Sequence, residues 1–173
     1  MLDIIKNSGK EVVAVGKIND IFTGKGITHV IKSKGNKEGI EATYQAMDSV
    51  KEGLIFTNLV DFDMLYGHRN DPVGYAQALE EFDEELPCFL ERLRENDLLV
   101  ITADHGADPT TESTDHSREY VPILITGPAV KNKISLGTRK TFADVGATIV
   151  DYLEAGKLQT GTSMLSALIG EVN

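Results

Sequence analysis

Five side chains that could bind metal ions follow two apolar segments of the chain. These segments, residues 54–56 and 98–103, are predicted to be strands. The polar residues that come after each strand should then lie together at one edge of a sheet. Carboxylates and imidazoles together suit Zn, Mn or Fe, whereas Mg prefers oxygen ligands alone. The mixed set therefore favours a transition ion. The five candidates are Asp63, His68, Asp104, His105 and His116.

Five ligands suit two cations better than one. Two cations about 3.5 to 4 Å apart neutralise the charge on the oxygens of a transferring phosphoryl group and activate a hydroxyl nucleophile. Phosphoryl or sulfuryl transfer is therefore the leading class of reaction. Spacing alone leaves two alternatives open, a mononuclear site and a purely structural cluster. His29, the remaining histidine, is expected to be an ordinary hydrogen-bonded side chain.

Alternating strands and helices must position these ligands. Strands are predicted over residues 11–18, 54–60, 98–103 and 120–126, and helices over 37–51, 73–94, 144–153 and 164–169. Pro87 is expected to kink the long second helix, and Asp144 to cap the third. This alternation predicts an α/β fold with a layered sheet. In such folds ligands gather beyond the C-terminal ends of the strands.

Composition limits the partners and the compartment. The chain has 173 residues, 41% of them hydrophobic, which is enough for one core and makes a single domain the default. A net charge of −10 argues against nucleic-acid and anionic-membrane partners. Cys88 is the single cysteine, so a reducing compartment, the cytoplasm, is expected. No segment reads as a signal peptide or a membrane span.

Several segments of the chain resemble the phosphopentomutase family. An Ala-Asp-His-Gly stretch alone indicates the wider alkaline phosphatase superfamily, and the Asp108-Pro109-Thr110 that follows favours the pentomutase branch. The resemblance runs through nearly the whole chain and implies an alkaline-phosphatase-like α/β/α core that is incomplete here. The segments that carry it are residues 60–69 (VDFDMLYGHR), 102–110 (TADHGADPT) and 116–122 (HSREYVP), and residues 15–18 with 20–22, and 142–148, also resemble that family.

The resemblance implies a dinuclear manganese enzyme. In that family a phosphorylated threonine passes phosphate between C1 and C5 of ribose or deoxyribose through a bisphosphate intermediate. Asp63, His68 and His116 would then hold one ion. Asp104 and His105 would hold the other, together with an aspartate and the phosphothreonine that the family carries in its N-terminal part.

No match to that aspartate or that threonine is found in this sequence. The simplest interpretation is that residues 1–173 form the C-terminal part of the core domain, without the first core strands and the cap domain. This chain then supplies no catalytic nucleophile, and we expect it to have no mutase activity alone. The missing strands should leave an exposed apolar patch, pairing with another copy, or partial disorder.

Lys17, at the end of the first predicted strand, is the candidate for binding the phosphate of a pentose phosphate substrate. A merely solvated lysine is the equal alternative, and Lys25, Arg69 and Arg118 rank lower because surface cations are usually solvated. Asp61 is a candidate for orienting a ligand imidazole or for capping a loop.

Two other functions stay open at this level. One is a phosphatase, sulfatase or cofactor-independent phosphoglycerate mutase of the same superfamily, which would share the Asp-His-Gly stretch. The other is a noncatalytic metal-binding or interaction module whose acidic helix at residues 80–85 contacts a partner. Metal identity, sugar preference and oligomeric state also stay open.

Overall fold

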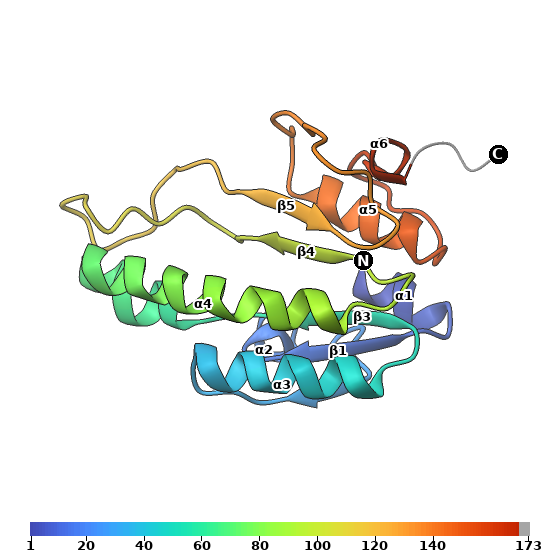
Figure 1. The fold of residues 1–173 in the computed structure, drawn as a ribbon, viewed down its shortest axis with the longest axis horizontal. Helices are drawn as coiled ribbons and strands as arrows, with labels where there is room; N and C mark the ends of the chain where they lie inside the picture. Colours follow the sequence, from blue (N-terminus) through green and yellow to red (C-terminus); the bar gives the residue numbers. More distant parts are fainter. Residues whose placement is uncertain (170–173) are drawn as a thin grey trace. The chain divides into compact units, whose positions relative to one another are not determined.

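The computed structural model describes residues 1–169 and divides into two compact units (Figure 1). Among the described residues, the first unit contains 1–58 and 131–169, and the second contains 59–130. Both units combine strands with helices, so the predicted α/β class is confirmed. Within residues 1–169, no helix has both the length and the apolar character needed to cross a bilayer.

The first unit is built on a parallel sheet of three strands. The sheet has the order β2-β1-β3, so β1 (Glu11–Val15) lies between β2 (His29–Ile31) and β3 (Gly53–Thr57). In this register Val13 lies opposite His29 on one side and Ile55 on the other. β1 is the most buried of the three strands, which explains why its sequence is a continuous apolar run.

Helices cover both faces of this sheet. Successive side chains of a strand point to opposite faces, and β1 divides its apolar residues accordingly. Val12 and Ala14 pack with Ile5 of α1 (Leu2–Asn7) and Val150 of α5 (Ala143–Tyr152). Val13 and Val15 pack with the small residues of α3 (Asn36–Ser49). This unit is therefore a three-layer α/β/α arrangement, and α2 (Ile18–Ile21) and α6 (Leu165–Ile169) complete its helices.

The second unit contains the long helix α4 (Pro72–Arg92) and an antiparallel strand pair, β4 (Leu99–Thr102) with β5 (Ile123–Thr126). Two short helical turns precede α4, the π-helix η1 (Phe62–Tyr66) and the 3-10 helix η2 (Gly67–Arg69). α4 begins where the Asp71 carboxylate accepts a hydrogen bond from the Gly74 backbone N–H, at 2.9 Å. It runs as one helix through Pro87 to Arg92.

Two details of the arrangement differ from the sequence-based expectation. β3 belongs to the parallel sheet of the first unit, whereas β4 pairs with β5 in a sheet of its own. The two ligand-bearing segments therefore do not leave neighbouring strands of one sheet. Asp144 does not cap α5, whose N-cap is Phe142, and instead lies in the first turn of that helix.

Asp144 connects α5 to the segment before α6. The side chain is buried, with 3% of the residue exposed. Its carboxylate accepts hydrogen bonds from Arg139 Nε at 3.0 Å and from the Thr162 backbone N–H at 2.8 Å. The Thr162 N–H and then Arg139 hold the pKa of Asp144 below its ordinary value, although burial opposes them. The Asp144 carboxylate, which the sequence pattern predicts to cap the helix, therefore binds Arg139 and the Thr162 N–H instead.

Asp144→Asn should lower the free energy of unfolding at neutral pH by about 1 to 3 kcal/mol, because the charged hydrogen-bond acceptor is lost in a buried site. A carboxyl whose pKa is lowered by folding stabilises the protein above its unfolded pKa of about 3.9 and loses that effect as the pH falls. The difference in stability between the wild type and Asp144→Asn should therefore shrink in acid.

Urea unfolding at neutral and acid pH measures this difference. Glu154→Gln, which changes an exposed carboxylate just beyond the same helix, is the control, and a difference independent of pH would contradict the assignment.

Candidate metal centre

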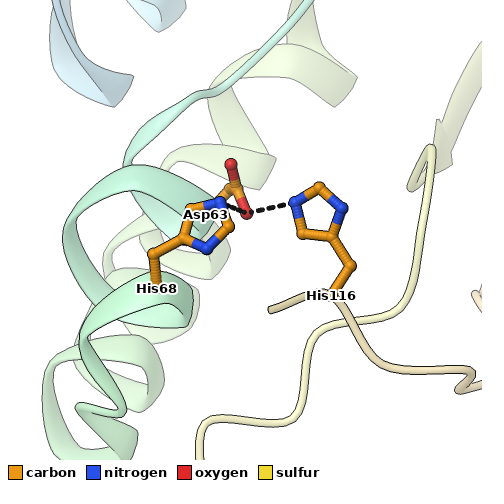
Figure 2. A group of neighbouring side chains, drawn as sticks. All are labelled: Asp63, His68 and His116. Atoms are coloured by element: carbon orange, nitrogen blue, oxygen red, sulfur yellow. Dashed lines mark ion pairs between the residues drawn. The ribbon is translucent and has the colours of Figure 1, made fainter. Parts of the chain in front are cut away.

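Asp63, His68 and His116 converge in the second unit (Figure 2). Asp63 Oδ1 lies 3.3 Å from His68 Nε2 and 3.2 Å from His116 Nε2. One ligand atom from each residue lies within 4.8 Å of the others. One carboxylate and two imidazoles are a donor set that suits a divalent transition ion.

The carboxylate at the centre of this triad supports that interpretation. Asp63 Oδ1 is buried, and no hydrogen bond to it is found within residues 1–169. A buried carboxylate oxygen without a donor carries a desolvation cost, so such an atom calls for a partner that the polypeptide does not supply. A cation held by the three side chains would be that partner. The residues present therefore fit a metal ion.

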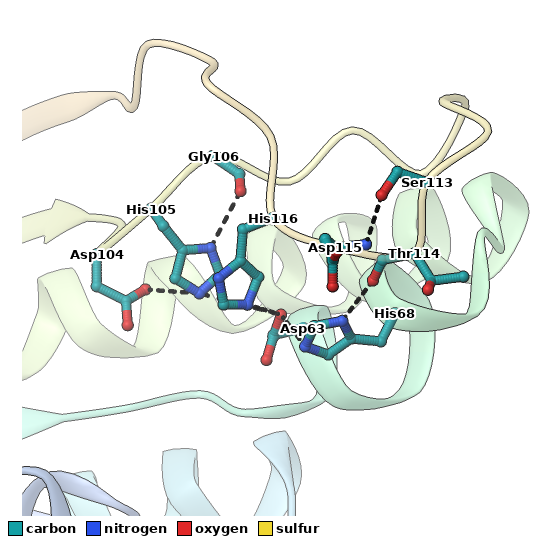
Figure 3. Close-up of polar contacts among 9 residues, drawn as sticks. All are labelled: Asp63, His68, Asp104, His105, Gly106, Ser113, Thr114, Asp115 and His116. Carbon is teal, nitrogen blue, oxygen red and sulfur yellow. Dashed lines mark hydrogen bonds and ion pairs between the residues drawn. The ribbon is translucent and has the colours of Figure 1, made fainter.

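Asp104 and His105 lie next to the triad (Figure 3). His105 Nε2 is 3.7 Å from Asp104 Oδ1 and 4.0 Å from Asp63 Oδ1. The His105 ring stacks on that of His116, with centroids 3.6 Å apart and an interplanar angle of 17°. The structure therefore brings all five predicted ligands together. Asp104 is the most exposed of them, with 66% of its side chain accessible.

Different local structures deliver these ligands. Asp104 and His105 follow β4 after a single residue, Ala103, close to where the apolar run predicts. Asp63 lies in the π-helix η1 and His68 in η2, several residues beyond the end of β3. Single π-helical turns often occur at functional sites, because the wider turn redirects a side chain. No pattern of residue types predicts this turn.

Backbone carbonyls orient two of the imidazoles. His68 Nδ1 lies 2.6 Å from the Thr114 carbonyl oxygen, and His105 Nδ1 lies 3.0 Å from that of Gly106. A carbonyl oxygen only accepts, so Nδ1 is the donor in both contacts and carries the proton. Nε2 is then left to face Asp63. This is the usual way in which a metal-ligating histidine is held, and sequence reasoning missed it because backbone acceptors have no residue signature.

Gly106 holds together the two arms that carry His105 and His116. The Ser117 N–H donates to the Gly106 carbonyl at 3.2 Å, and the two residues form an isolated antiparallel bridge. A Cβ on Gly106 would lie 2.6 Å from both the Glu119 nitrogen and the Ser117 oxygen. The Asp-His-Gly stretch therefore needs its glycine for close backbone approach.

α4 supports the η1 turn from one side. The Phe62 and Tyr75 rings pack with centroids 5.7 Å apart. Burial, and then the neighbouring Asp63 carboxylate, raise the pKa of Tyr75. At Gly74 a Cβ would lie 2.5 Å from the Tyr66 ring, so this glycine lets η1 and α4 approach closely. The turn that carries Asp63 thus rests on the start of a long helix.

The remaining candidates have other surroundings. Lys17 belongs to the first unit, but the predicted strand over 11–18 was too long at its end. β1 ends at Val15, and Lys17 is the N-cap of the short helix α2 that follows. His29 contacts the Thr28 hydroxyl at 3.0 Å and Glu11 at 3.6 Å, which agrees with the ordinary role expected for it. Asp61 is the N-cap of η1, and its side chain makes no capping hydrogen bond. The phosphate-binding role of Lys17 and the orienting role of Asp61 stay predictions.

Comparison with known proteins decides the family. The sequence model of the Metalloenzyme superfamily matches residues 4–157. This chain belongs to the Metalloenzyme superfamily. One solved structure, that of the PH0037 protein from Pyrococcus horikoshii, matches 90% of this chain with a TM-score of 0.65, and the match spans 52% of that protein. At 16% identity it shows a shared fold only.

Curated relatives are much closer in sequence. The phosphopentomutase of Caldanaerobacter subterraneus subsp. tengcongensis is 60% identical over 97% of this chain, and that of Desulfitobacterium hafniense strain DCB-2 is 59% identical over 98%. The chain spans 43% and 44% of the lengths of these two proteins. The metalloenzyme family and the ligand triad together support a divalent metal ion as the cofactor.

Proposed function

We propose that this chain is the C-terminal part of the core domain of a phosphopentomutase, which interconverts the 1-phosphate and 5-phosphate of ribose or deoxyribose. The observation that carries the proposal is the 60% identity to a phosphopentomutase over nearly the whole chain. Because the chain spans less than half of that relative, the proposal assigns the first core strands, the cap domain and the phosphorylated threonine to the remainder.

Two divalent cations, manganese in particular, are the proposed cofactors. Asp63, His68 and His116 would hold one, and Asp104 with His105 would contribute to the other. Such a pair of ions neutralises charge on the oxygens of a transferring phosphoryl group. The chain's own task is to bind and orient. The Thr114 and Gly106 carbonyls keep the protons of His68 and His105 on Nδ1, so that each Nε2 stays open for a metal.

Lys17 is proposed to bind a phosphate of the pentose phosphate substrate. It lies two residues beyond the C-terminal end of β1, where ligands of parallel sheets gather, and an ammonium on a flexible stem suits a phosphate. The acidic chain is proposed to act without nucleic-acid or membrane partners, in the cytoplasm. Two apolar side chains on strands, Val30 of β2 and Leu124 of β5, are exposed, and the proposal is that the remainder of the enzyme covers them.

A chimaeric enzyme tests this proposal. The chain replaces its matching segment in the Caldanaerobacter phosphopentomutase, and turnover of ribose 5-phosphate is measured with Mn²⁺ for the chimaera and for the chain alone. We expect activity in the chimaera and none in the isolated chain. Turnover by the isolated chain would refute the proposal. Hydrolysis of phosphate esters by the chimaera would favour a phosphatase, and unfolding on chelation without any activity would favour a noncatalytic metal module.

A further inference from the structure

The loop between His105 and His116 is closed and internally bonded. The bridge between Gly106 and Ser117 closes its base. Inside it, the Thr110 backbone N–H and hydroxyl both donate to Asp108 Oδ1, at 2.9 and 2.6 Å. The Thr111 hydroxyl lies within hydrogen-bonding distance of the carbonyls of Asp108 and Ser113, at 3.0 and 3.1 Å. These hydrogen bonds link residues 108, 110, 111 and 113 of the loop to one another.

Asn70 contacts this loop from outside it. Its side-chain Nδ2 donates to the Thr111 carbonyl at 2.9 Å, in a partly buried contact. The residue has φ 48° and ψ 46°, a left-handed conformation that asparagine tolerates better than most residues. Its own N–H donates to the Gly67 carbonyl, and the next residue, Asp71, caps α4. Asn70 is thus anchored at the start of a long helix and reaches across to the loop.

The same short segment meets the loop a second time at the metal centre. His68, two residues before Asn70, donates from Nδ1 to the Thr114 carbonyl at 2.6 Å. The two contacts fall on carbonyls three residues apart, Thr111 and Thr114. Because 40% of the His68 side chain is exposed, water could replace the Thr114 carbonyl if the loop moved away. The contact between His68 and the Thr114 carbonyl therefore requires that the loop stays in place.

We propose that Asn70 is a positioning residue for the metal centre, which fixes residues 108–115 so that the Thr114 carbonyl holds His68 with its proton on Nδ1. A surface imidazole can carry its proton on either nitrogen, and a proton on Nε2 blocks the atom that faces Asp63. The role in metal affinity rests on the proposed function, since it assumes that the triad binds a cation. Loss of such an outer partner typically weakens metal binding about 10- to 100-fold.

Two substitutions of Asn70 distinguish the role of its side-chain amide from the role of its left-handed backbone conformation. Asn70→Gly keeps a residue that adopts the left-handed conformation freely but removes the donor. Asn70→Asp keeps the shape and presents a carboxylate, which cannot donate, to the Thr111 carbonyl. The control is Glu112→Ala, which removes an exposed side chain from the same loop. Circular dichroism of the full chain establishes that each variant is folded.

Imidazole ¹⁵N spectra of the metal-free chain and Mn²⁺ titration calorimetry give two readouts. In mildly alkaline buffer, we expect His68 of the wild type and of Glu112→Ala to be protonated on Nδ1, and both Asn70 variants to show a mixture of tautomers. Mn²⁺ affinity should fall about tenfold or more in the Asn70 variants only. Unchanged His68 spectra in either folded Asn70 variant would overturn the inference. If the wild type binds no Mn²⁺, the proposed metal function fails, while the spectra still decide the role of Asn70.

Discussion

Asp63→Asn should weaken Mn²⁺ binding by more than about a hundredfold, beyond the usual cost of losing an outer-shell partner. Asp63 is the carboxylate of the triad, and Nε2 atoms of His68 and His116 both lie within 3.3 Å of its Oδ1. An amide removes the negative charge that the cation needs. The stability of the metal-free chain should change little, because Oδ1 contributes no hydrogen bond to the described fold.

Titration calorimetry measures this loss directly, and thermal unfolding with and without Mn²⁺ provides a second measurement. A ligand at 100 times its dissociation constant stabilises a protein by about 2.7 kcal/mol, so the wild type should gain stability with Mn²⁺ while the Asp63→Asn chain should gain little. Asp115→Asn is the matched control, because its carboxylate lies in the loop beside the centre and is exposed. Equal Mn²⁺ affinity in the wild type and in Asp63→Asn would show that the triad does not bind the metal ion.

Gly106→Ala should both destabilise the second unit and impair metal binding. The added Cβ would lie 2.6 Å from two backbone atoms, the Glu119 nitrogen and the Ser117 oxygen, and backbone cannot move aside as a flexible side chain does. Overpacking of this kind costs about 1 to 3 kcal/mol. Separating the bridged arms would also disturb the stacked rings of His105 and His116.

The matched control for this substitution is Gly146→Ala in α5. The Cβ there would contact side-chain atoms, the nearest being Leu158 Cδ1 at 3.3 Å, and alanine favours a helix over glycine. Urea unfolding should therefore show a loss for Gly106→Ala and no comparable loss for Gly146→Ala. Native stability together with unchanged Mn²⁺ affinity in Gly106→Ala would show that the bridge does not shape the centre.

Local patterns predicted most elements but not how they pair. The apolar run at residues 11–18 contains β1, and the helical spacing at 37–51 corresponds to α3. Burial of one or both faces of an element requires apolar residues at a regular spacing, which the sequence shows directly. Strand pairing joins residues far apart in the chain, so no local pattern predicts that β3 and β4 belong to different sheets. Asp144 shows the same limit, since one of its partners, the Thr162 backbone N–H, lies 18 residues further along the chain.

The candidate site divides in the same way. Residue types and the β4 strand end were sufficient to select Asp104 and His105, and the family resemblance grouped Asp63 with His68 and His116. The π-helical turn beneath Asp63 and the carbonyls that orient the imidazoles could not be predicted, because both are properties of backbone geometry. What the sequence reveals is the chemistry of the ligands, and the structure adds how they are held.

Anomalous diffraction from crystals of the chain soaked in Mn²⁺ tests the central claim most directly. We predict a manganese peak bound by Asp63, His68 and His116, about 2 Å from a ligand atom of each. A second peak at Asp104 and His105 is not expected in this chain, because the proposal places the other ligands of that ion outside it. Crystals in which the three side chains keep their positions and no manganese lies between them would contradict the account.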